Sequence, residues 1–338
     1  MHRRQLIQLT AAWPAASLPG LPRAQTTSTS QAAPWPWRPI RLLTSGAGSV
    51  LDQRARWLAE RLAPVLAQPI TVENLPAVGG TLAAQQVARA APDGHTLLLY
   101  TQGLASISPH LLEKPGYDPL KELQPLVRFG LGGLVLVVAG SSPWRTVAEL
   151  AEASRRQSGG LMFGTPGIGT PQHLASELLL QHLGVPGTHV PYNGAGRLMT
   201  ALLGGAEVGW AFEALSVAQP HLEAGRLRAL GVTQAQRAPL LPGVPTLSES
   251  GVARFEFLAW TGLAAPAGTP EAVGERLHAV LAQLAQAPDT QQWLAQRGSQ
   301  AGVLGPKEFA DYVREEHARL GALIRSRGLS PSTRPQGS

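Results

Sequence analysis

The sequence predicts an α/β fold in two lobes, each a sheet flanked by helices. Three observations support this prediction. Apolar runs typical of strands alternate with helical patterns along the 338 residues. The 37 glycines and 29 prolines are dispersed between these segments, as turn residues are. The chain is 44% hydrophobic and long enough for roughly two domains of about 150 residues, so it can bury a sizeable core.

The N-terminal residues are predicted to precede the fold. Residues 1–24 begin with Arg3 and Arg4, continue with a short apolar stretch and end at Ala24, near a plausible cleavage site, so we expect an export signal. Two prolines and the short apolar length disfavour a membrane anchor. The arginine pair fits a twin-arginine or an ordinary secretory route. A polar, proline-rich leader follows at 25–35, and we expect a periplasmic protein.

Charge and cysteine usage exclude several function classes. Without residues 1–24, which carry three arginines and no acidic residue, the formal net charge falls from +6 to +3. The remaining cations are interleaved with acids and form no run of five, which disfavours nucleic-acid binding. The chain has no cysteine, so thiol catalysis, disulfides and thiolate metal sites are excluded.

The first expected lobe starts with two strand–loop–helix units. A strand at 38–44 leads through "SGAGSVLD" to a helix for which Asp52 is the expected N-cap and Pro64 the expected end. A strand at 69–74 leads through "LPAVGG" to a helix that carries Ala83 to Ala91. A buried strand, "HTLLLYT", and a looser stretch at 102–128 complete this part.

The second expected lobe repeats the alternation, and a tail follows it. The expected elements are a strand at 132–140, a helix at 141–156, strands at 161–164 and from 188, a helix at 197–205, a strand at 207–213, a helix to Gly225 and a strand at 227–233. Residues 255–270 form an extended apolar run that could cross between the lobes. The tail from 270 to 326 is helical by its spacing.

Four expected strands end in small-residue loops that open helices: "SGAGSVLD", "NLPAVGG", "GTPGIGTPQH" and "YNGAG". The unpaired N–H groups at a helix N-terminus attract anions, and glycines let a ligand approach the backbone. Ser49, Thr165 and Thr170 can add hydroxyl donors. A single glycine-rich turn is common in α/β proteins. Two such loops in each lobe favour a cleft that binds a small anionic ligand from both sides.

The motifs of several enzyme classes are missing. Pro171 stands where a dinucleotide fingerprint needs its third glycine, and neither a G-K-[ST] phosphate loop nor a G-x-S-x-G nucleophile motif occurs. His173 and Glu177 are one helical turn apart and could ligate a metal. Because no second histidine shares that face, packing or ligand contact is the favoured role of His173.

Six stretches, taken together and in order, give the chain a family resemblance. They are "WPWRPIRLLTSGAGSVLDQRARWLAERL", "VENLPAVGGTLAAQQVARAAPDGHTLLL", "FGTPGIGTPQHLASELL", "HVPYNGAGRLMTALLGGAEVGWAF", "LGVTQAQRAPLLPGVPTLSESG" and "WTGLAAPAGTP". From about Trp37 to about Leu329 the chain resembles the TctC or Bug family, the substrate-binding receptors of tripartite tricarboxylate transporters.

The resemblance implies a two-lobed periplasmic-binding-protein fold of type II that closes on a small carboxylate without a cationic clamp. Lobe one would comprise 36–132 plus 260–338, and lobe two 133–259. The implied ligand contacts are Gly46, Ala47, Gly48, Ser49, Asp52, Gly79 and Gly80 in lobe one, and Thr165, Gly167, Gly169, Thr170, His173, Tyr192 and Ala195 in lobe two.

The implied receptor is a monomer without a cofactor that delivers its ligand to membrane transporter subunits. Two alternatives stay open. One is a receptor that passes ligand occupancy to a signalling partner, and the other is an exported hydrolase or isomerase that uses His173 with an acid.

The chain departs from the family pattern at two places. Thr44 and Ser45 replace a usual Pro-Phe pair and Ser49 replaces a glycine, which predicts a more polar and more open wall. Glu213 stands where many members have aspartate, and this longer acid could meet a ligand amine or narrow the pocket. Asp52 could equally cap its helix. Trp210 and Trp260 could line the cleft, although tryptophans on strands more often belong to a core.

Overall fold

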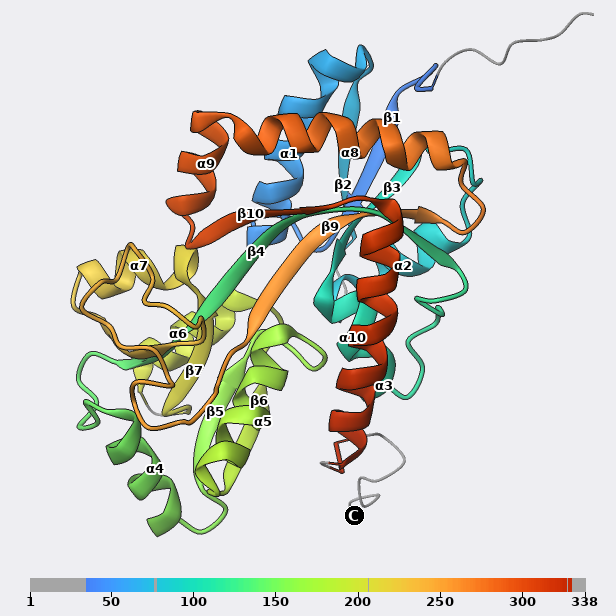
Figure 1. The fold of residues 1–338 in the computed structure, drawn as a ribbon. Helices are drawn as coiled ribbons and strands as arrows, with labels where there is room; N and C mark the ends of the chain where they lie inside the picture. Colours follow the sequence, from blue (N-terminus) through green and yellow to red (C-terminus); the bar gives the residue numbers. More distant parts are fainter. Residues whose placement is uncertain (1–34, 76–77, 206, 327, 330–338) are drawn as a thin grey trace, which may run out of the picture. The chain divides into compact units, whose positions relative to one another are not determined.

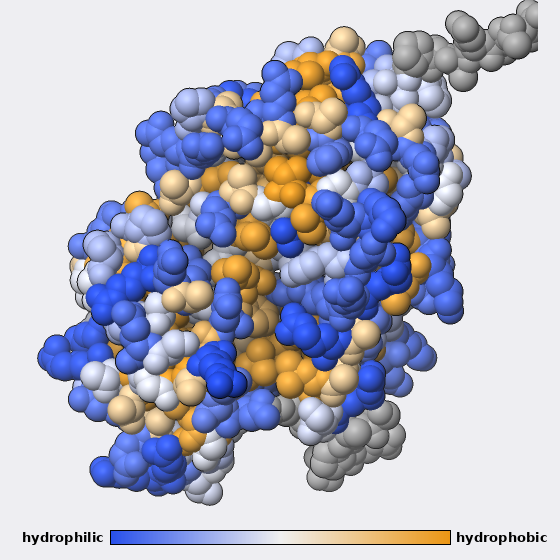
Figure 2. Space-filling view, viewed as in Figure 1, coloured by the Kyte–Doolittle hydropathy of each residue, from blue (hydrophilic) through white to orange (hydrophobic). Residues whose placement is uncertain are grey.

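The structure is a computed structural model that describes residues 35–75, 78–205, 207–326 and 328–329. The expected export signal and all but the last residue of the expected leader lie outside these residues. Trp35–Ser338 forms one compact unit. Within the described residues, no helix is long and apolar enough to cross a membrane. On the face that Figure 2 shows, hydrophilic residues predominate around the periphery and apolar residues gather towards the middle.

Strands and helices alternate along most of the described chain (Figure 1), as predicted. The strands are β1 (Ile40–Thr44), β2 (Ile70–Asn74), β3 (Thr96–Thr101), β4 (Leu123–Ala139), β5 (Leu161–Thr165), β6 (Gly187–Pro191), β7 (Trp210–Ala214), β8 (Leu227–Val232), β9 (Leu258–Pro266) and β10 (Ser299–Leu304). The helices are α1 (Val50–Leu66), α2 (Thr81–Ala88), α3 (Ser108–Leu111), α4 (Val147–Arg156), α5 (Pro171–Leu183), α6 (Ala195–Gly204), α7 (Leu215–Glu223), α8 (Glu271–Gln286), α9 (Pro288–Ala295) and α10 (Pro306–Ser326). A short 3-10 turn, η1 (Val78–Gly80), precedes α2, and a π-helical turn, η2 (Gly103–Ile107), precedes α3.

The long strand β4 connects two sets of strands. Its residues 123–133 pair antiparallel with β9, and its residues 134–138 pair antiparallel with β7. The first strand group comprises 123–133 of β4 with β9, β10 and the parallel strands β1, β2 and β3. The second strand group comprises 134–139 of β4 with β8, β7 and the parallel strands β5 and β6. Figure 1 shows β4 and β9 running side by side.

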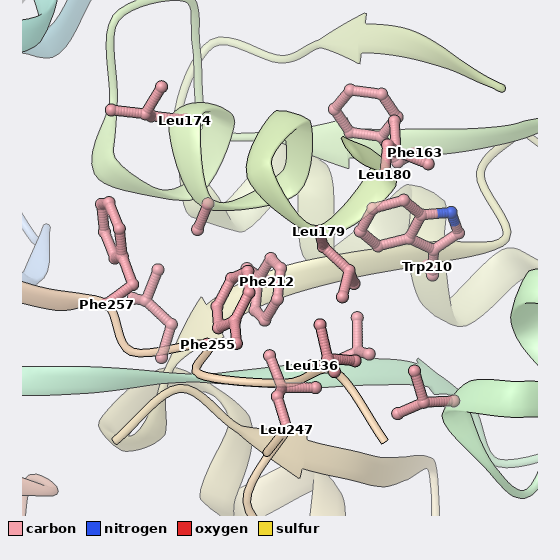
Figure 3. Packing of buried hydrophobic residues seen from close by; sticks show 14 of the residues in the cluster. Leu136, Phe163, Leu174, Leu179, Leu180, Trp210, Phe212, Leu247, Phe255 and Phe257 are labelled. Atoms are coloured by element: carbon pink, nitrogen blue, oxygen red, sulfur yellow. The ribbon is translucent and has the colours of Figure 1, made fainter. Parts of the chain in front are cut away.

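Each strand group has apolar clusters on both sides of its sheet. In the first group one cluster lies beneath α1 and α8 and another beneath α2 and α10. The largest cluster of the second group contains Phe163, Trp210 and Phe212 together with Leu174 and Leu179 of α5 (Figure 3). This cluster also includes four residues that belong to η2, α3 and α10: Ile107, Leu111, Leu320 and Ile324. An apolar contact therefore joins α10 to the core of the second strand group.

Several helix boundaries in the structure differ from those that the sequence predicted. α1 continues past Pro64 to Leu66, because a proline in the last turn removes only one helical hydrogen bond. α4 begins at Val147 rather than 141, with Thr146 as its N-cap. α2 ends at Ala88, before Ala91.

The two regions predicted least well contain regular structure. The stretch at 102–128 holds η2, α3 and the start of β4. The tail holds β10, a strand that pairs with β4 among the helices. In both places, contacts with segments that are distant in the sequence determine the structure, because the local pattern of apolar residues is weak.

Candidate functional site

The glycine-rich loops lie at the carboxyl ends of parallel strands. Thr44 of β1 is paired with Asn74 of β2, and Thr165 of β5 is paired with Pro191 of β6. Neighbouring parallel strands therefore bring their loops to the same edge of each sheet. α1, α2, α5 and α6 follow these loops, so the predicted strand–loop–helix arrangement is confirmed.

The loop after β1 is held by a reciprocal cap at the start of α1. Ser49, not Asp52, is the N-cap: its backbone is extended and its Oγ accepts the Asp52 N–H at 3.1 Å. Asp52 lies in the first turn, where its Oδ2 accepts the Gly48 N–H at 2.8 Å. The predicted N-cap role of Asp52 is therefore wrong by three residues. The pair instead resembles a capping box, in which each partner satisfies a backbone N–H of the other's segment.

Asp52 also connects the first two loops. It is 4% exposed, and its Oδ1 accepts the Asn74 Nδ2–H at 2.8 Å and lies 3.0 Å from Arg56 Nε. Asn74 Nδ2 also donates to the Ser45 carbonyl at 2.9 Å. Burial would raise the pKa of Asp52, but the hydrogen bonds from Gly48 and Asn74 and the charge of Arg56 hold it below its usual value. Asn74 carried no site signal in the sequence, since it ends an ordinary strand.

The rest of this first set of loop residues leaves its backbone accessible. Ala47 and Gly48 are exposed, and no described atom comes within 4 Å of a Cβ placed on Gly46 or Gly48. Gly48 has φ +76°, which favours glycine. A Cβ placed on Gly80 would lie 3.5 Å from the Ser45 Cβ, so the start of α2 packs beside the loop after β1.

The loop after β5 is shaped by its own hydroxyl groups. Thr170 is the N-cap of α5: its Oγ1 accepts the His173 N–H at 3.3 Å and donates to the Gly167 carbonyl at 2.8 Å. Thr165 is fully buried, and its Oγ1 accepts the Gly167 N–H at 3.3 Å. These contacts set the course of the loop and direct the first turn of α5 towards the edge of the sheet.

His173 belongs to a column of stacked rings. Its ring lies 4.0 Å from that of His189 with an interplanar angle of 16°, and the Phe163 ring also stacks on that of His189, at 5.0 Å. The His173 Nδ1 accepts the Gly169 N–H at 3.4 Å, and its Nε2 is 3.7 Å from Glu177 Oε1. No group of three potential metal ligands occurs in the described part of the chain. The geometry therefore supports a packing role for His173. His189 lies on a polar strand, and nothing in the sequence had indicated it.

The loop after β6 lies against the loop after β5. The Tyr192 N–H donates to the Thr165 carbonyl at 2.9 Å, and the Gly194 N–H donates to the Pro166 carbonyl at 3.0 Å. The partly exposed Tyr192 donates its Oη–H to Glu207 Oε2 at 2.8 Å. Ala195, half-buried, is the first residue of α6. Thr165, Tyr192 and Ala195 are thus brought to one edge.

Three other residues singled out in the sequence are buried. Glu213 has 0% exposure, and its Oε2 accepts the Ala214 N–H at 3.1 Å. Burial raises the pKa of Glu213 to about 8 against the weaker opposing effect of the Ala214 N–H and the Gln172 amide. Trp210 and Trp260 are each 1% exposed and lie in apolar clusters, which is the core placement expected of strand tryptophans.

Ser108, the first residue of α3, joins the two sets of loops. Its Oγ–H donates to the Gly169 carbonyl at 3.2 Å, and it lies 3.6 Å from where a Gly79 Cβ would stand. A Cβ on Gly169, whose φ is +81°, would come within 2.5 Å of the Ser108 Oγ, so only glycine fits this approach. Gly79 of the first set and Gly169 of the second set therefore both lie against the Ser108 side chain. Ser108 comes directly after the π-helical turn η2, and sequence periodicity does not predict such a turn.

Comparison with known proteins identifies the family of the chain. The family model described as "Tripartite tricarboxylate transporter family receptor", TctC, matches residues 54–329. The chain is 35% identical over 312 residues to a UPF0065 protein from the tcbD–tcbE intergenic region of Pseudomonas sp. strain P51, which covers 91% of this chain and 92% of that protein.

Two solved structures have the same fold. Rpa4515 of R. palustris with adipate has a TM-score of 0.82 and 30% identity, covering 88% of this chain and 99% of that one. MatC of Rhodopseudomonas palustris with bound malate has a TM-score of 0.79 and 32% identity, covering 86% of this chain and 100% of that one. On these matches, the chain belongs to the TctC family of tripartite tricarboxylate transporter receptors.

Proposed function

We propose that this protein is an exported, periplasmic receptor that reversibly binds a small di- or tricarboxylate and delivers it to tripartite tricarboxylate transporter subunits. One observation carries the proposal: the helix-opening loops of both strand groups converge on Ser108, so Gly79 and Gly169 lie against the same side chain. The related proteins with adipate and malate support a carboxylate as the ligand class.

The chemistry of the loops suits a carboxylate. α1 and α5 begin with capped first turns at Ser49 and Thr170, and helix N-termini favour negative charge through their N–H groups and dipole. Exposed backbone at Ala47 and Gly48 leaves space for a ligand or for bridging waters. His173, the candidate base of an enzyme, is 1% exposed and stacked on His189, which supports binding rather than catalysis.

We infer that the two strand groups are the cores of two lobes, 36–132 plus 260–338 and 133–259, that close over the ligand. β4 changes its partner from β9 to β7 between Gly133 and Leu134, and β9 begins at Leu258. These strands are the connections at which hinge bending is expected. The protein would act as a monomer.

The test is native mass spectrometry of the purified protein, followed by a thermal-shift screen of mono-, di- and tricarboxylates. We expect a di- or tricarboxylate to co-purify or to raise the melting temperature with dose, because a ligand that binds only the folded state stabilises it. Thr170→Ala should reduce the shift. Thr146→Ala is the matched control, since it removes an equivalent N-cap from α4, a helix that follows none of the four site loops. Absence of any shift across the panel would refute the proposal.

A further inference from the structure

Arg54 is a buried cation in the second turn of α1. It is 7% exposed, its Nη1–H donates to Thr261 Oγ1 at 2.6 Å, and its Nη2–H donates to Ser299 Oγ at 3.0 Å. Its Nε is buried and has no hydrogen-bond partner among the described residues. The guanidinium thus lies beneath α1, against β9 and β10, with only neutral hydroxyls as partners.

Among the described residues, no acidic group pairs with this charge. None of the ion pairs between described residues includes Arg54, and the charge that acts on its pKa is that of Arg297, a second cation. Burial and Arg297 lower the pKa of Arg54 to about 10, so it remains charged at neutral pH. Asp52, on the same helix, is engaged by Asn74 and Arg56. A buried charge without a counter-charge is unfavourable for stability, which points to a role outside folding.

Arg54 lies near the loops of the candidate site. Ser49, which caps α1 and ends the loop after β1, is five residues earlier, or about 7.5 Å along the helix axis. Side chains on a helix lean towards its N-terminus, which directs the guanidinium towards that loop. Its partner Thr261 is paired with Thr101, the last residue of β3, at the strand end where the site loops begin. The uncompensated charge therefore lies beside the end of β3, at the end of the sheet from which the site loops leave.

We propose that Arg54 sets the charge preference of the binding site, so that ligands with two carboxylates bind more tightly than those with one. The inference rests on the proposed function. Arg54 acts through its electrostatic field as a positioning residue rather than through direct contact. Because Coulomb energy scales with ligand charge, each ligand carboxylate within about 10 Å gains on the order of tenfold in affinity at an effective dielectric constant of about 20.

The experiment compares ligands matched in carbon number by isothermal titration calorimetry on the purified protein. The probes are adipate against hexanoate and succinate against butyrate. We expect Arg54→Met to weaken dicarboxylate binding more than monocarboxylate binding, by up to about a hundredfold against about tenfold. Arg54→Lys keeps the charge and should retain most of the preference. Arg61→Met, on the same helix but in a partly exposed pair with Asp289, is the matched control and should change neither.

The outcomes separate this role from a structural one. Equal weakening of both ligand classes by Arg54→Met, no weakening at all, or equal losses in Arg54→Met and Arg54→Lys would overturn the proposal. If Arg54→Met does not fold, Arg54→Gln replaces it and the Arg54→Lys result still decides. A wild-type protein that binds no carboxylate would refute the proposed function, and this inference with it. Wild-type binding that is indifferent to Arg54 would refute the inference alone.

Discussion

Glu213 places a carboxyl group in a fully buried position, which makes the stability of the protein depend on pH. Its pKa is raised by burial from 4.5 to about 8, so the folded state holds its proton where the unfolded state releases it. The free energy of unfolding therefore decreases as pH rises from about 4.5 through 8. Glu213→Gln should match wild type at pH 5 and be more stable by several kcal/mol at pH 9.

Thermal unfolding at pH 5, 7 and 9 checks this expectation. Glu223→Gln is the matched control, because Glu223 is an exposed acid on the neighbouring helix α7. An identical loss of stability with pH in wild type and Glu213→Gln would mean that another group titrates. Such a result would also remove the basis for regarding the buried Glu213 as uncharged at neutral pH.

Single residues of the site differ in how far the sequence reveals them. Ser49 and Thr170 were predicted as loop hydroxyls because each lies in a glycine-rich loop before a helix. Both are N-caps in the structure, through the Ser49–Asp52 and Thr170–His173 bonds, although the sequence had indicated Asp52 as the cap of α1. Ser108 meets Gly169 across 61 positions and Arg54 meets Thr261 across 207. Their importance comes from pairings that no local pattern encodes.

At the scale of elements, the first turn of α1 depends on the ionised carboxylate of Asp52. Asp52 has a lowered pKa, so its contribution to stability is present above its ordinary value of 3.8 and is lost as pH falls below that value. Asp52→Asn should lower the free energy of unfolding at pH 7 by roughly 1–3 kcal/mol, because buried charge-assisted bonds to Gly48 and Arg56 are weakened.

Thermal unfolding between pH 3 and pH 7 measures this effect, and the difference from wild type should narrow at the acid end. Asp311→Asn serves as the control, because its pairs with Lys307 and Arg314 are partly exposed and such pairs contribute little. A difference that stays constant down to pH 3 would show that the Asp52 charge is not responsible.

Helices and strands could be predicted where the apolar residues recur with a strong period and a clear boundary residue marks the end of the segment, and less well elsewhere. The strand–loop–helix units around α1, α2 and α5 follow from alternating apolar runs and glycine-rich turns. β10 reads "SQAGVL", with few apolar residues, and is a strand only because β4 offers it a free edge. The extra length of β4, which starts at Leu123, likewise depends on β9, far away in the sequence.

At the scale of the whole molecule, α10 packs against the cores of both strand groups. Leu320 is 1% exposed and belongs to the same apolar cluster as Leu174 and Phe163. Leu320→Ala should reduce stability by about 2–5 kcal/mol. The proposed closure of the lobes predicts that it also weakens ligand binding, because α10 joins the cores of the two strand groups.

Leu281→Ala is the matched control, since Leu281 is 0% exposed but lies in a cluster confined to the first strand group and its helices. It should lower the melting temperature similarly and leave affinity unchanged. Calorimetry and small-angle X-ray scattering, with and without ligand, measure both effects. Equal affinities for the two leucine variants would show that the α10 contact does not influence closure.

The position of β9 has a consequence for how the chain acquires its structure during synthesis. β9 lies between β3 and β4, yet the ribosome makes it about 150 residues after β3. At about 5–20 residues per second, β3 waits roughly 10–30 s for this neighbour. The strands β4 to β8 of the second strand group are all made before β9, although the apolar cluster of that group also takes in Phe255, Phe257 and Leu320 from later segments. The sheet that contains the first strands to be made is therefore completed late, and its apolar strand "TLLLYT" stays without its neighbour β9 throughout that interval, as a segment to which a chaperone can bind.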